Sequence, residues 1–236
     1  MFYFLMRHIL GGPLAKLYFR PWARGVENVP DEGPAILASN HLAVIDSFVM
    51  PLVLDRRVQF LGKSDYFTGR GIKGRMVAGF MRGVGTIPVD RSGGKGEGAL
   101  ATAKQVLDEG GLFGIYPEGT RSPDGRLYKA KTGVARLAIE SGAPVIPVVM
   151  VDTDKAQAIG QVIPKPKAIG VIFGEPLDFS RYAGQGNDRF ILRAVADEIT
   201  LATLRLTEQE FVDTYAQTAK ARLAAERKAA AEAKDN

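Results

Sequence analysis

Apolar residues along this chain form short continuous runs that alternate with stretches of helical spacing. The runs have the length of buried strands, and they occupy residues 34–39, 58–62, 112–116, 145–151 and 168–173. A shorter strand is predicted at residues 85–91. Helical spacing recurs at residues 66–82, 99–109, 133–141 and 188–203. Strands that alternate with helices predict an α/β fold, with a mixed, largely parallel central sheet flanked by helices.

The two ends of the chain differ from this pattern. Residues 1–24 carry apolar and aromatic positions at helical spacing, interleaved with Arg7, Lys16 and Arg20 and interrupted at Gly11-Gly12-Pro13. Such a segment is typical of an amphipathic helix at a membrane interface; a helix packed on the core is the alternative. Residues 211–236 form a charged tail, helical or frayed. We therefore expect one main domain at residues 25–210 between these two segments.

Composition narrows the possible chemistry. The chain has no cysteine and two histidines, which excludes disulfides and thiolate nucleophiles and leaves no expected metal site. The net charge of +5 fits an anionic ligand or an anionic phospholipid surface and is too small to indicate nucleic acid. Apolar runs are interrupted by charge before the roughly 20 residues of a membrane span. We expect a complete chain, peripheral or monotopic at the cytoplasmic face of the cell membrane.

The most informative segment is Asn40-His41, with Asp46 five residues after the histidine. It follows a predicted buried strand and precedes an apolar stretch at residues 47–54. In one continuous helix, five residues rotate the chain by roughly 500°, so the two side chains would point apart. They can meet only if His41 lies in a turn and Asp46 in the first helical turn. The pair would then be a base and its orienter; a capping histidine beside an unrelated carboxylate is the alternative.

Three more motifs follow this segment in order. They read Gly-Thr-Ile-Pro-Val-Asp-Arg at residues 85–91, Tyr-Pro-Glu-Gly-Thr-Arg-Ser at 116–122 and Val-Ile-Pro-Val-Val at 145–149. Together with the Asn-His-x-x-x-x-Asp segment, the set resembles the glycerolipid acyltransferase superfamily, specifically the 1-acyl-sn-glycerol-3-phosphate acyltransferases. The resemblance covers roughly residues 25–180 and identifies the main domain as an acyltransferase domain. Tyr116 stands where this family usually has phenylalanine.

The resemblance implies an O-acyltransferase of phospholipid biosynthesis. The enzyme would move a fatty acyl group from a thioester, acyl-CoA or acyl carrier protein, to the free sn-2 hydroxyl of 1-acyl-glycerol-3-phosphate (lysophosphatidate), giving phosphatidic acid without a cofactor. His41 would be the general base and Asp46 would orient it, which agrees with the chemistry of the residues. The acceptor and its phosphate would be bound by residues at strand ends, namely Lys63, Arg91, Glu118, Gly119, Thr120 and Arg121.

Other functions remain open at this stage. Glycerol-3-phosphate or another lysolipid or glycolipid hydroxyl could replace lysophosphatidate as the acceptor. A serine hydrolase would want an exposed nucleophile, often in Gly-x-Ser-x-Gly, and no such pentapeptide occurs in the chain. A non-catalytic lipid-binding protein would keep the basic and aromatic surfaces but would have no need of His41. Each cation, taken alone, could instead form a surface salt bridge.

Overall fold

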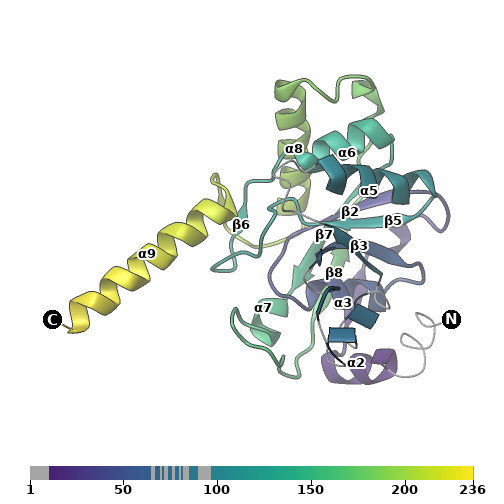
Figure 1. Cartoon of the computed structure of the whole chain (residues 1–236). Helices are drawn as coiled ribbons and strands as arrows, with labels where there is room; N and C mark the ends of the chain where they lie inside the picture. Colours follow the sequence, from purple (N-terminus) through teal and green to yellow (C-terminus); the bar gives the residue numbers. More distant parts are fainter. Residues whose placement is uncertain are drawn as a thin grey trace.

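Figure 1 shows a computed structural model of the whole chain. The structure describes residues 11–64, 67–69, 71, 74–75, 78–79, 81, 85–89 and 97–235. Arg91, residues 1–10 and much of the predicted basic helix at residues 66–82 lie outside this set, and so do the side chains of Lys63 and Val89. Those predictions therefore stay predictions.

A seven-stranded sheet forms the centre of the molecule, in the order β1-β8-β7-β2-β5-β3-β4. Strands β7, β2, β5, β3 and β4 are mutually parallel, β8 is antiparallel to β7, and β1 is parallel to β8. The sheet strands are β1 (Trp22–Arg24), β2 (Ala35–Ser39), β3 (Val58–Lys63), β4 (Thr86–Val89), β5 (Leu112–Ile115), β7 (Val145–Val151) and β8 (Gly170–Phe173). The predicted fold class, a mixed and largely parallel sheet, is confirmed.

Helices cover both faces of this sheet (Figure 1). The described helices are α2 (Gly11–Phe19), α3 (Asp46–Leu52), α5 (Glu97–Asp108), α6 (Gly133–Ser141), α7 (Thr153–Ala156), α8 (Arg189–Leu204) and α9 (Ala216–Asp235), of which α9 does not cover the sheet; short 3-10 turns lie at Val26–Asn28 and Ser180–Tyr182. Successive side chains of a strand point to opposite faces of the sheet, so the residues of β2 contribute alternately to the hydrophobic cores on its two faces. Ile36 and Ala38 join the core under α5, α6 and α8, whereas Leu37 joins the core that includes Met50 of α3.

The predicted break at Gly11-Gly12-Pro13 falls in the first turn of α2. Proline is tolerated there because the first N–H groups of a helix have no partner inside the helix. Among the residues that the structure describes, no helix combines the length and the apolar character needed to cross a bilayer.

The charged tail begins differently from the prediction. Strand β9 (Phe211–Val212) pairs in parallel with β6 (Leu127–Tyr128), and Ala216 and Ala219 of α9 pack against the buried Tyr128. Two-residue strands leave no periodic signal in a sequence, which is why this contact was not predicted. Beyond it, α9 extends away from the body of the molecule (Figure 1).

The parallel strands bring the sequence motifs to one edge of the sheet. Strands β2 and β5 are direct neighbours, with Ala38 opposite Ile115. His41 follows the carboxyl end of β2, and the motif at residues 116–122 follows the carboxyl end of β5. Since parallel strands end at the same edge, the two motifs meet there, which is the position where open α/β sheets bind their ligands.

Candidate active site

The side chains of His41 and Asp46 are in contact. His41 lies in the turn after β2, and Asp46 is the first residue of α3, so the helix begins as the spacing required. The imidazole Nδ1 lies 2.9 Å from Oδ2 of Asp46. The same oxygen accepts the main-chain N–H groups of Leu42 at 2.8 Å and Ala43 at 3.0 Å. The turn therefore folds around a carboxylate oxygen, and the imidazole is part of that arrangement.

This geometry decides which ring nitrogen is available. With the Asp46 carboxylate as the acceptor of this hydrogen bond, a neutral His41 carries its proton on Nδ1 and leaves the lone pair on Nε2. Asp46 is fully buried, whereas the His41 side chain is 17% exposed. A partly exposed imidazole is thus held by a buried carboxylate, an arrangement that could serve acid–base chemistry.

The loop at residues 116–122 holds the backbone of His41 on two sides. Oε1 of Glu118 accepts the His41 main-chain N–H at 3.3 Å, and the N–H of Ser122 donates to the His41 carbonyl at 2.8 Å. Oε2 of Glu118 accepts the N–H of Tyr128 at 3.1 Å. Both Glu118 oxygens thus accept hydrogen bonds from main-chain donors, and this residue connects His41 to the loop that follows β5.

Tyr116 packs directly on the imidazole of His41. The ring centroids are 3.8 Å apart and the planes differ by 12°. The hydroxyls of Tyr116 and Ser47 lie 2.7 Å apart, so Ser47, in the first turn of α3, anchors the far end of the phenol. Burial, followed by the charge of Asp46, raises the pKa of Tyr116 well above its ordinary value, so the phenol stays neutral. The role of Tyr116 in orienting His41 was not predicted, although its departure from the usual phenylalanine marked the position.

Glu118 is a buried acid whose pKa is raised. Burial raises its pKa from 4.5 to about 8, and the hydrogen bonds from the His41 and Tyr128 backbone lower it only in part. The nearby charges of Asp46 and Asp124 add to the rise. Neutral Glu118 is therefore the dominant form at neutral pH, which keeps a second negative charge away from the His41–Asp46 pair.

Asn40, which directly precedes His41, is bonded to distant parts of the chain. Its amide oxygen accepts the Met150 N–H at 2.7 Å, and its amide nitrogen donates to the Met150 carbonyl at 3.2 Å. The same nitrogen donates to Oε1 of Gln209 at 2.6 Å, and Gln209 in turn donates to the carbonyl of Gly125. Gln209 was not predicted, since nothing in the local sequence relates it to a residue 169 positions earlier.

The other predicted site residues lie on the same loop or at strand ends. Gly119 is exposed, with a φ of +75° that favours glycine, and its main-chain N–H donates to the Tyr116 carbonyl at 2.9 Å. Thr120 and Arg121 are half-buried beside it, and Arg121 forms no ion pair with a residue that the structure describes. The backbone of Lys63 ends β3. The contribution of Arg91 lies outside the described residues.

No group of three or more histidine, aspartate or glutamate side chains that could hold a metal ion occurs among the described residues.

Comparisons with known proteins identify the family of this chain. The model of the family described as Acyltransferase matches residues 21–151, more than half of the chain, so the protein belongs to the acyltransferase family. The matched region contains His41, Asp46 and the whole 116–122 loop.

Two relatives are named 1-acyl-sn-glycerol-3-phosphate acyltransferase. The chloroplastic one of Brassica napus is 28% identical over 61% of this chain and 40% of its own length. That of Bacillus subtilis is 25% identical over 66% of this chain and 73% of its own length. The chain thus spans about two fifths of the length of the plant relative.

A solved structure shares the fold. The 1-acyl-sn-glycerophosphate acyltransferase PlsC of Thermotoga maritima superimposes with a TM-score of 0.62, at 24% identity, over 84% of this chain and 77% of that one.

Proposed function

We propose that this protein transfers a fatty acyl group from an acyl thioester, acyl-CoA or acyl carrier protein, to the sn-2 hydroxyl of 1-acyl-glycerol-3-phosphate, giving phosphatidic acid. The observation that carries the proposal is the 2.9 Å contact between Nδ1 of His41 and Asp46, which leaves Nε2 to act as a base. The names of the relatives support lysophosphatidate as the acceptor.

The reaction needs no nucleophile from the protein. Nε2 of His41 takes the proton of the acceptor hydroxyl while the hydroxyl oxygen attacks the thioester carbonyl carbon. The tetrahedral intermediate then collapses, the carbon–sulfur bond breaks, and the imidazolium returns the proton to the leaving thiolate. Asp46 stabilises the imidazolium between the two steps, and it does so without reorganisation because main-chain donors already fix its carboxylate.

The acceptor phosphate calls for cations beside this base. Arg121 is the first candidate for binding the phosphate. It lies in the same loop as Glu118, and it has no ion-pair partner among the described residues. A guanidinium pairs with phosphate through two parallel hydrogen bonds. Lys63, which ends β3, and Arg91 are proposed to complete the phosphate site.

The proposed reaction takes place at a membrane surface, where both the acceptor and the product reside. We propose that residues 1–24 contribute to binding that surface. Leu14 and Leu17 of α2 support this, because both are largely exposed to solvent.

The test is an acyl-transfer assay in detergent or liposomes with a labelled acyl thioester. His41→Ala and Asp46→Asn are each expected to lower turnover by at least about a hundredfold, since a general base contributes 10²- to 10⁴-fold. Glu175→Gln, which changes an exposed residue after β8, is the control. A panel of acceptors, including glycerol-3-phosphate, identifies the acceptor by mass spectrometry of the product. Unchanged turnover in His41→Ala contradicts the mechanism.

A further inference from the structure

Exposed apolar side chains gather at one end of the molecule. Val162 is 88% exposed, Ile163 79%, Leu17 77% and Leu14 69%. Two of these residues belong to α2 and two belong to the loop at residues 158–166, between α7 and β8, which we call the apolar loop. Single exposed apolar residues are ordinary, but a cluster of large ones marks an interaction surface.

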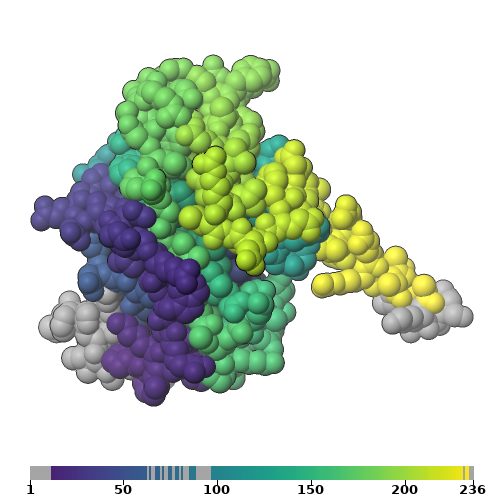
Figure 2. Space-filling model, turned by 180° about the vertical axis from the view of Figure 1, so that it is seen from behind, coloured from purple at the N-terminus to yellow at the C-terminus, as the bar shows by residue number. Residues whose placement is uncertain are grey.

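The apolar loop and α2 lie side by side although about 145 residues separate them in the sequence. The hydroxyl of Tyr18 donates to the carbonyl of Pro164 at 2.9 Å. A shallow groove between the two segments is lined by Leu14, Leu17, Tyr18, Ile163, Pro164 and Pro166. Figure 2 shows α2 in purple with green segments beside it at the base of the molecule. The two segments thus form one apolar face.

The apolar loop is also bound to the turn that carries the proposed base. Gln157, which is buried, accepts the main-chain N–H of Ile45 at 3.2 Å through its amide oxygen. Its amide nitrogen donates to the carbonyls of Gln161 and Val162, each at 3.3 Å. Ile45 directly precedes Asp46. The buried amide of Gln157 therefore connects the apolar loop to the His41–Asp46 turn.

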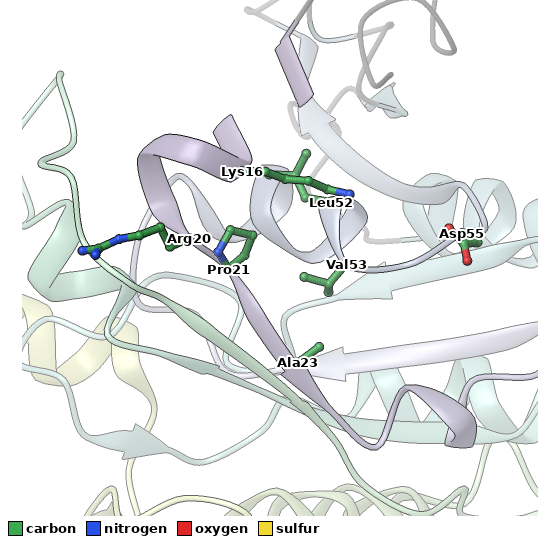
Figure 3. A pocket seen from close by; sticks show the side chains of 7 residues that line it. All are labelled: Lys16, Arg20, Pro21, Ala23, Leu52, Val53 and Asp55. Atoms are coloured by element: carbon green, nitrogen blue, oxygen red, sulfur yellow. The ribbon is translucent and has the colours of Figure 1, made fainter. Parts of the chain in front are cut away.

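Basic side chains flank this face. Lys16 of α2 and Arg20, the residue after its last turn, line a hollow between α2 and the end of α3, together with Leu52 and Asp55. Figure 3 shows Lys16 extending toward Leu52, whereas Arg20 points away on the other side of the hollow. On the apolar loop, Lys165 is exposed. Apolar side chains flanked by cations match the boundary between acyl chains and anionic headgroups.

We propose that the apolar loop is a second membrane-docking element, which inserts Val162 and Ile163 into an anionic lipid surface beside α2. Docking through the apolar loop would hold the His41–Asp46 turn at the lipid surface, because Gln157 fixes the distance between them. The inference deepens the proposed membrane association of residues 1–24, and it can be tested without turnover.

The first experiment measures partitioning of the full chain into vesicles of phosphatidylcholine and phosphatidylglycerol by sedimentation. Val162→Asp/Ile163→Asp is expected to weaken partitioning by at least about tenfold, since burial of one such side chain contributes about 1.5–3 kcal/mol and 1.4 kcal/mol corresponds to tenfold. Phe190→Asp is the matched control, since Phe190 is 71% exposed and lies at the start of α8, at the opposite end of the molecule (Figure 1). Partitioning of this control is expected to change less than twofold.

A parallel variant, Leu14→Asp/Leu17→Asp, separates the two docking elements. If it abolishes partitioning while the loop variant partitions normally, the apolar loop is not a docking element and the proposal for residues 1–24 stands. If the loop variant instead changes only the oligomeric state, the face binds a second copy of the chain and the proposal is overturned.

The second experiment tests insertion directly. Trp22 is the only tryptophan, so a Trp22→Phe background allows a single tryptophan to be placed at Val162 or, as the control, at Phe190. Brominated lipids are expected to quench the fluorescence of Val162→Trp and to leave that of Phe190→Trp unchanged. Equal quenching at both positions, or none at Val162→Trp, overturns the proposal. Unchanged far-UV circular dichroism shows that each variant is folded.

Discussion

The phenol ring of Tyr116 lies flat on the imidazole of His41, with ring centroids 3.8 Å apart. The contact fixes the plane of the imidazole, while Asp46 fixes its rotation through Nδ1. The buried Phe60 also stacks on Tyr116, with centroids 5.7 Å apart. The proposed base is thus held by a stacked aromatic ring as well as by a carboxylate.

The stacking predicts different effects on kcat for two substitutions of Tyr116. Tyr116→Phe keeps the ring and loses only the Ser47 hydrogen bond, so kcat is expected to fall by less than about threefold. Tyr116→Ala removes the stacked ring and is expected to lower kcat by at least about tenfold, since aromatic pairs contribute about 0.5–1.5 kcal/mol beyond the area they bury and truncation also leaves a cavity. Steady-state kinetics with lysophosphatidate measures both.

A double-mutant cycle supplies the control. Ser47→Ala should match Tyr116→Phe, and the double variant should add nothing further, because both changes remove the same hydrogen bond. If Tyr116→Ala keeps full kcat, the ring does not position the imidazole.

Glu118 predicts a pH dependence of stability. Its pKa is about 8 in the folded protein and 4.5 as the ordinary value, so the folded state binds more protons between these limits. The free energy of unfolding is therefore expected to decrease as the pH rises from about 4.5 through 8, by an amount on the order of a few kcal/mol. Urea denaturation at a series of pH values measures the slope.

Glu118→Gln separates this effect from general destabilisation. The variant is expected to be less stable at every pH, because an amide NH₂ then faces one of the two main-chain donors, but the slope across this range should flatten. The exposed Glu175→Gln serves as the control and should keep the slope. A persistent slope in Glu118→Gln would show that another group titrates.

The sequence predicted the parts of this site that depend on local pattern. Helix α6 and strand β7 have the predicted bounds, residues 133–141 and 145–151, because helical apolar spacing marks the first and a continuous apolar run marks the second. The meeting of His41 and Asp46 followed from one condition, a helix that begins at the aspartate. Contacts across the fold were not predictable in this way. The stacking of Tyr116 and the hydrogen bond between Gln209 and Asn40 depend on strand order and on a long return of the chain, which leave no periodic trace.

Gln209 predicts that the C-terminal segment stabilises the site. Gln209→Ala removes a hydrogen bond to the buried Asn40 and one to the Gly125 carbonyl, and it leaves their polar atoms without those partners. The free energy of unfolding is expected to fall by about 1–3 kcal/mol. Urea denaturation measures the loss, and Glu208→Ala, an exposed neighbour, is the control. Equal stability of the two variants would show that the contact contributes nothing.

The proposed role of Arg121 predicts that its substitution changes the KM values of the two substrates differently. If its guanidinium binds the acceptor phosphate, Arg121→Ala should raise the KM for lysophosphatidate by at least about tenfold, because a hydrogen bond to a charged group contributes about 1.5–3 kcal/mol. The KM for the acyl thioester should change less than about threefold. Arg126→Ala is the matched control, since that guanidinium is already paired with Asp124 at 2.7 Å. An equal rise in both KM values would show that Arg121 supports the structure of the loop and does not bind the acceptor phosphate. Loss of a contact to that phosphate should affect the KM of the acceptor alone.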